Sequence, residues 1–165
     1  MKLRLMKLGL LTTISAFVFA GADLGGLSLF NSSVKAQSSE PTVVEITQTG
    51  CQFIETEKKD YGFTTNSAQD CKTINKDTED ERKAEFVPLS LPAGDYIFKV
   101  TNQNVPYELG FYLRGQGLGI ATLPKTSGGG LVAGTTKEYR VTLKPGKYWI
   151  SCPLNPTPDY PLIVS

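Results

Sequence analysis

The sequence predicts an all-β protein, an antiparallel β-sandwich, and three observations lead to that prediction. About six or seven short strand-like segments follow one another, with turn signals about every ten residues. Glycine (16) and proline (10) are frequent, as is usual where tight turns join many short strands. No internal repeat and no helical heptad competes. The exception is a polar, partly helical insertion near residues 55–85.

The N-terminus has the pattern of a secretory signal. A basic start, MKLRLMK, precedes the apolar run LGLLTTISAFVFA and small residues suited to cleavage. We expect cleavage after Ala36, with cleavage after Ala20 as the alternative. An uncleaved membrane anchor is a further alternative, which Asp23 and three glycines argue against.

These signals predict a signal peptide over 1–36, a flexible linker over 37–41 and one domain over 42–165. The expected location is the periplasm, the extracellular space or the thylakoid lumen, where a disulfide persists. We expect no membrane contact after signal cleavage.

Alternation of apolar and polar residues identifies the strands. The candidate segments read TVVEITQ, FVPLSL, DYIFKVT, YELGFYL, KEYRVTL, GKYWISC and PLIVS. In DYIFKVT, the alternation places Tyr96, Phe98 and Val100 on one face, which we expect to be buried. Between Arg114 and Thr135 the chain is expected to be loop.

The insertion is charged and poor in aliphatic residues. Ser67 stands three residues before Asp70, as in an acidic capping box, so we predict a short surface helix near 67–83. The run DTEDER, Asp77 to Arg82, is interpreted as a solvated face of that helix rather than a site for a hard cation.

The absence of histidine excludes the most chemistry. The 165 residues contain none, so His-based catalysis and His-ligated metal sites cannot form. A blue-copper centre needs two His and one Cys, so an ordinary one is excluded too. Net charge is +1 and no basic face emerges, so we do not expect nucleic acid as a partner.

Three stretches together resemble the cupredoxins. They are LPAGDYIFKVTN (91–102), NVPYELGFYL (104–113) and LKPGKYWISCPLNPTPDYPLIV (143–164). The chain looks more like the cupredoxin-like domain of periplasmic iron-uptake (EfeO-type) proteins, and like small exported cyanobacterial cupredoxin-like proteins, than like plastocyanin. The resemblance covers 42–54 and 86–165 and implies a Greek-key β-sandwich.

The resemblance also assigns the family's metal-ligand positions. The first His of blue-copper members corresponds to Tyr107, the Cys to Cys152 and the second His to Asn155; the axial Met would fall near Tyr160, beside Asp159. The implied candidate metal site is therefore Cys152, Tyr107, Asn155 and Asp159, for copper or iron without blue-copper chemistry. Alternatively, Cys152 is a buried core residue.

Three cysteines leave one thiol over. We favour a Cys51–Cys71 disulfide, because it would attach the polar insertion to the sandwich. By closing that loop, it would stabilise the fold by about 3 kcal/mol. Cys51–Cys152 is the alternative pairing, and no pairing is the third.

The predicted function is that of an exported, non-catalytic cupredoxin-like module that handles a metal, copper or iron, or binds a periplasmic partner protein. One alternative is a copper-dependent electron carrier with an atypical site. Another is an enzyme with Cys152 as nucleophile, which we do not expect, since no base lies near Cys152 in sequence.

Overall fold

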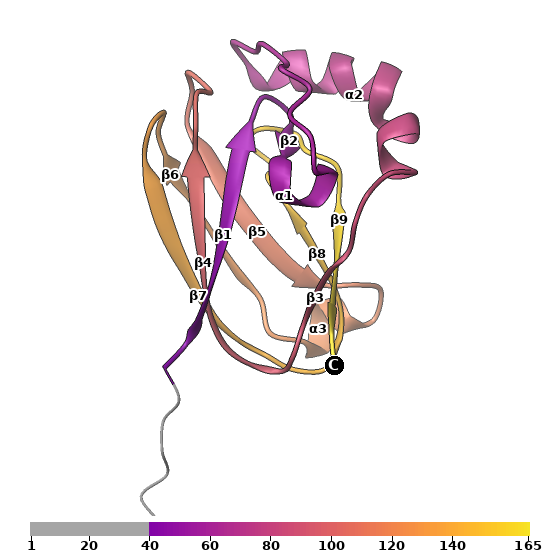
Figure 1. Cartoon of the computed structure of the whole chain (residues 1–165), viewed down its shortest axis with the longest axis vertical. Coiled ribbons are helices and arrows are strands. Elements are labelled where there is room, and N and C mark those ends of the chain that lie inside the picture. The colour runs from indigo at the N-terminus through magenta and orange to yellow at the C-terminus, as the bar shows by residue number, and fades with distance from the viewer. Residues whose placement is uncertain (1–39) are drawn as a thin grey trace, which may run out of the picture. The chain divides into compact units, whose positions relative to one another are not determined.

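Two β-sheets pack face to face in the computed structural model, which describes residues 40–165 (Figure 1). One sheet has the order β2 (Gln52–Phe53), β1 (Thr42–Thr49), β4 (Gly94–Asn102), β7 (Thr136–Leu143). The other has the order β3 (Leu89–Leu91), β9 (Tyr160–Val164), β8 (Gly146–Ser151), β5 (Leu109–Gly115), β6 (Thr126–Leu131). The helices are α1 (Ile54–Glu57), α2 (Ala68–Lys83) and α3 (Gly119–Thr122). The predicted β-sandwich is confirmed; the proposed signal peptide, and residues 37–39 of the linker, lie outside the described residues.

Two strand pairs depart from the expected antiparallel pattern. β1 runs parallel to β4, and β3 runs parallel to β9, while the remaining pairs are antiparallel. A parallel pair requires a crossover connection, and here the insertion together with β3 returns the chain to the start of β4 beside β1.

The stretch from Arg114 to Thr135, expected to be loop, contains two elements. The short helix α3 follows β5, and the edge strand β6 then pairs with β5. The sequence of β6, TSGGGL, shows no alternation, because four of its six residues are exposed and only Leu131 is buried. Its pairing depends on a partner strand that sequence pattern does not reveal.

The core lies between the sheets and follows the predicted alternation. Tyr96, Phe98 and Val100 of β4 are buried, as are the alternating residues of β7 and β8. Phe111 links the sheets, with its ring centroid 5.5 Å from that of Phe98 and 5.1 Å from that of Tyr139. Each such side chain stabilises the fold by about 1.5–3 kcal/mol through burial.

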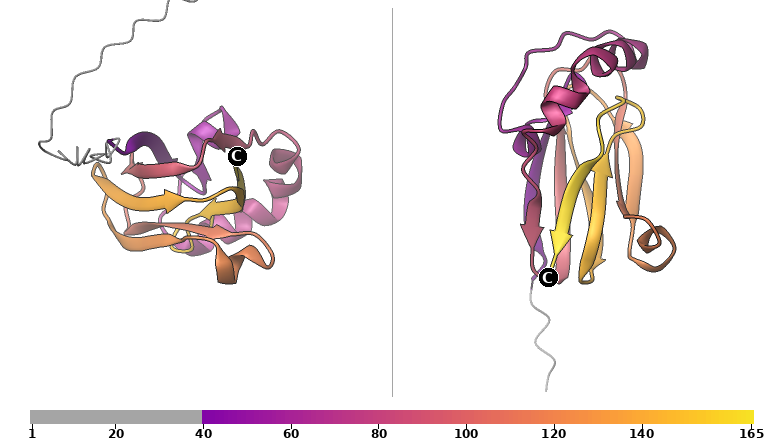
Figure 2. Two further views of the ribbon diagram at one scale, coloured as in Figure 1. Left: turned by 90° about the horizontal axis from the view of Figure 1, so that it is seen from below. Right: turned by 90° about the vertical axis from the view of Figure 1, so that its right-hand side faces the viewer.

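The insertion lies across one end of the sandwich, where α2 crosses above the ends of the strands (Figures 1 and 2). The predicted helix is confirmed, and Ser67 and Asp70 form the capping box. The favoured Cys51–Cys71 disulfide is also confirmed, and it joins α2 to the turn between β1 and β2.

The expected solvated face of α2 is wrong at Arg82. This side chain is buried and pairs with the buried carboxylate of Glu57, while the preceding acidic residues of the run are partly or fully exposed. A charge pattern along one helix cannot reveal a partner in another element, which is why the sequence reading missed it. Within residues 40–165, no helix is long and apolar enough to cross a membrane.

Candidate functional site

Tyr107, Cys152 and Asn155 come together at the α2 end of the sandwich, as the resemblance implied. Tyr107 lies in the loop between β4 and β5, and Cys152 follows the last residue of β8. Asn102, at the end of β4, shapes that loop: its Oδ1 accepts the Val105 N–H at 2.8 Å, and its Nδ2 donates to the Val105 carbonyl at 3.0 Å. The loop conformation therefore places Tyr107 at this end.

The Cys152 thiol is fully buried and surrounded by donors. The backbone N–H groups of Gly110 and Asn155 donate to its Sγ at 3.3 and 3.2 Å. Burial raises the pKa of Cys152, and these N–H groups offset only part of that rise. At neutral pH the group is therefore a thiol, which lacks the nucleophilicity of a thiolate.

Asn155 connects the parts of this end. Its Oδ1 accepts hydrogen bonds from the Tyr107 hydroxyl at 2.9 Å and the Cys51 N–H at 3.2 Å, and its Nδ2 donates to the Thr49 carbonyl at 3.0 Å. Cys71 Sγ lies 3.0 Å from the same Oδ1; a disulfide sulfur has no proton, so this is a close contact. We call Tyr107, Asn155, Cys152 and the disulfide the closed pole.

The closed pole is covered by the insertion. Cys51 and Cys71 are fully buried, and the Tyr107 hydroxyl lies 3.3 Å from Thr65 Oγ1 in the segment before α2. Desolvation raises the pKa of Tyr107, so its hydroxyl stays protonated and donates.

Asp159, the fourth predicted ligand, does not join this group. Both of its carboxylate oxygens accept from Arg114 at 2.7 Å, and the Arg114 guanidinium also stacks over the Tyr112 ring at 4.8 Å. The neighbouring Tyr160 turns into the core, where its hydroxyl donates to Glu57. The resemblance implied that Asp159 lies near the site, but its ion pair with Arg114 fixes the direction of its side chain.

Sequence reasoning missed a second buried network beside the closed pole. Arg82 Nε donates to Glu57 at 2.8 Å, and its other nitrogens donate to Asn75 at 2.8 Å and to the Cys51 carbonyl at 3.1 Å. Burial alone would lower the pKa of Arg82, but the hydrogen bond and charge of Glu57 raise it. The rings of Tyr61 and Phe63 lie 5.4 and 5.1 Å from the guanidinium carbon.

The donor set of the closed pole does not fit a copper or iron ion. Among the described residues Cys152 supplies the single free thiol, and burial raises its pKa and keeps it protonated. Asn155 already uses both its oxygen and its nitrogen within the protein. Among residues 40–165 there is no group of three His, Cys, Asp or Glu side chains able to hold a metal ion.

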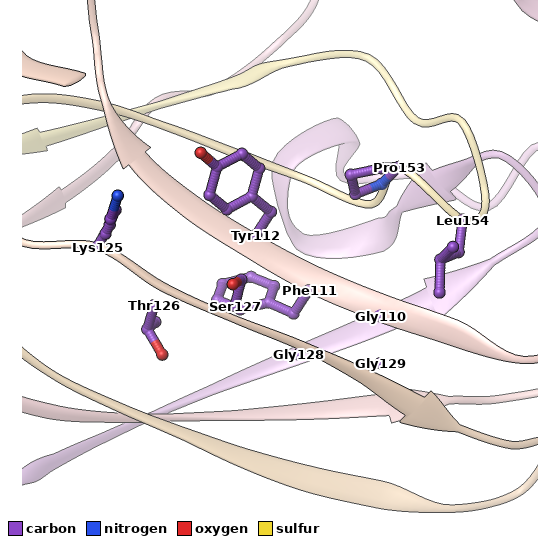
Figure 3. Close-up of a pocket in the computed structure, with 10 residues that line it drawn as sticks. All are labelled: Gly110, Phe111, Tyr112, Lys125, Thr126, Ser127, Gly128, Gly129, Pro153 and Leu154. Atoms are coloured by element: carbon purple, nitrogen blue, oxygen red, sulfur yellow. The ribbon is translucent and has the colours of Figure 1, made fainter. Parts of the chain in front are cut away.

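An open groove runs beside the closed pole, between the outer side of β5–β6 and the loop after β8 (Figure 3). Its volume is about 590 Å³. A side chain at Gly110 would meet the Gly128 carbonyl at 2.5 Å, so bare backbone forms part of its floor. Tyr112, Pro153 and Leu154 supply its apolar walls. One side of the groove is formed by strand β6, which the sequence pattern does not predict.

Comparison with known proteins yields similarity to solved structures alone. No protein-family model and no curated protein matches the chain. Among solved structures, auracyanin B is similar over 74% of this chain and 88% of its own length, with 17% identity and a TM-score of 0.43. At this identity and TM-score, the similarity carries no information about ligands or activity.

Proposed function

We propose that this chain is an exported, non-catalytic cupredoxin-like module that binds a partner protein through the groove beside the closed pole. One observation carries the proposal: the polar atoms of Asn155 are engaged within the protein, whereas the adjacent groove is open. Metal handling through Cys152 has the resemblance to iron-uptake domains in its favour and the donor set against it.

The groove has the properties of a protein-binding surface. Its walls are largely apolar, and Leu154 on its rim is 45% exposed. Lys125 is its charged lining residue, so apolar contact and backbone hydrogen bonding dominate recognition. Its size suits a few side chains of a partner.

Site-specific cross-linking tests the proposal. A photoreactive amino acid is placed at Leu154 and, as a matched control, at Val43 on the other sheet, which is equally exposed at 45%. In cells that naturally make the protein, we expect one discrete adduct from position 154 and none from 43. Ser127→Trp, which fills the groove, should abolish that adduct. Equal adducts from both positions, no adduct from either, or an adduct that survives Ser127→Trp would overturn the proposal.

A further inference from the structure

Two apolar side chains project from the end of the sandwich that bears α3. Leu118 is 93% exposed and Ile120 is 52% exposed. The loop that carries them is held in place: the Gln116 N–H donates to the Lys147 carbonyl at 2.9 Å, and Leu123 packs against the core. A fixed loop that presents leucine and isoleucine to solvent is a feature of interaction surfaces.

Two exposed lysines lie at the same end of the sandwich. Lys144 follows the end of β7 and Lys147 is the second residue of β8, and the Lys147 carbonyl accepts the hydrogen bond from Gln116. Asp95, the second residue of β4, accepts a hydrogen bond from Thr142 on β7. The α3 end therefore combines apolar projections with positive charge.

The described part of the chain begins at the same end. Pro41 lies beside Arg140 and Thr142, and β4 pairs Gly94 with Leu143 next to the β7–β8 turn. Residue 40, where the described part of the chain begins, therefore lies at the α3 end. The helix α2 lies at the opposite end (Figure 1).

We infer that the α3 end docks on an anionic membrane surface. Leu118 and Ile120 enter the interface between headgroups and acyl chains, and Lys144 and Lys147 attract anionic lipids. This goes beyond the proposed function, because the groove and its Leu154 rim are not part of this surface. It also departs from the expectation of no membrane contact after export.

Vesicle co-sedimentation tests the inference with the exported chain. We expect binding to vesicles of phosphatidylglycerol and phosphatidylcholine at low salt, little binding to phosphatidylcholine alone, and loss of binding at high salt. Leu118→Ser with Ile120→Ser should lower the partition coefficient about tenfold or more. Lys144→Gln with Lys147→Gln should weaken binding to anionic vesicles only. Val132→Ser, at a site 51% exposed, is the matched control and should have no effect.

Several outcomes would overturn the inference. These are no binding to anionic vesicles, binding that resists salt, or binding unchanged by the Leu118 and Ile120 substitutions. If those substitutions instead remove a protein adduct while vesicles do not bind, the surface recognises a protein. Ser127→Trp should leave vesicle binding intact, so failure of this inference is distinguishable from failure of the groove proposal.

Discussion

Arg82 shows how much of the insertion's attachment rests on one side chain. Replacing it by Met leaves the Glu57 carboxylate buried without its counter-charge, so we expect a loss of about 3–5 kcal/mol in the free energy of unfolding. The matched control is Lys83→Met, which removes an exposed pair with Glu79 and should cost less than about 0.5 kcal/mol. Urea unfolding measures both, and equal effects would contradict the assigned role of Arg82.

Cys152 makes the free energy of unfolding fall at alkaline pH. Its pKa is raised in the folded state by burial, so its contribution to stability is complete below the ordinary thiol pKa of 9.0 and is lost as pH rises through the folded value. Above pH 9.0, we expect this group to lower the free energy of unfolding by up to about 1.4 kcal/mol per pH unit.

Cys152→Ala tests this assignment, because the buried tyrosines that also titrate at high pH are unchanged in the variant. Urea unfolding at neutral and alkaline pH should show a smaller alkaline loss in the variant than in the parent chain. Identical alkaline losses would mean that the thiol is not the group responsible.

At the scale of elements, the disulfide holds α2 on the sandwich. Cys51→Ala with Cys71→Ala should lower the free energy of unfolding by about 3 kcal/mol, chiefly by freeing the unfolded chain. Hydrogen exchange should show greater loss of protection in α2 than in β4, since the α2 end loses its covalent attachment. Uniform loss across both elements would contradict the view of α2 as a separately attached cover.

The capping box of α2 predicts a second pH effect. Backbone N–H groups of Asn66 and Ser67 lower the pKa of Asp70, so its stabilising effect is present above its ordinary value of 3.8 and is lost as pH falls through the folded value. Asp70→Asn should therefore reduce the melting temperature at neutral pH and have a smaller effect in strong acid. A pH-independent effect would count against the capping role.

At the scale of the whole molecule, sequence reasoning succeeded where local pattern determines structure. The alternation in β4 and the Ser67–Asp70 spacing each depend on neighbours along the chain, and both were predicted correctly. The strand β6, the burial of Arg82 and the direction of Asp159 depend on contacts with distant segments. No local pattern records those contacts, so these features were missed.

In the candidate site too, part of the arrangement was predicted from the sequence and part was not. Tyr107, Cys152 and Asn155, which the resemblance grouped, lie close together in the structure. The resemblance could not show that Asn155 bonds to the Thr49 carbonyl and the Cys51 N–H, because matched sequence positions do not record hydrogen bonds between distant segments. These hydrogen bonds occupy the oxygen and nitrogen of the Asn155 side chain.

Metal binding by the protein with its Cys51–Cys71 disulfide intact tests the central claim most directly. The protein is dialysed against copper and iron in the presence of a competing chelator, and bound metal is measured beside a Cys152→Ser variant. The closed pole predicts far less than one metal ion per chain, with no difference between the two proteins. One copper or iron ion per chain, lost in Cys152→Ser, would contradict the claim and establish a metal-handling site.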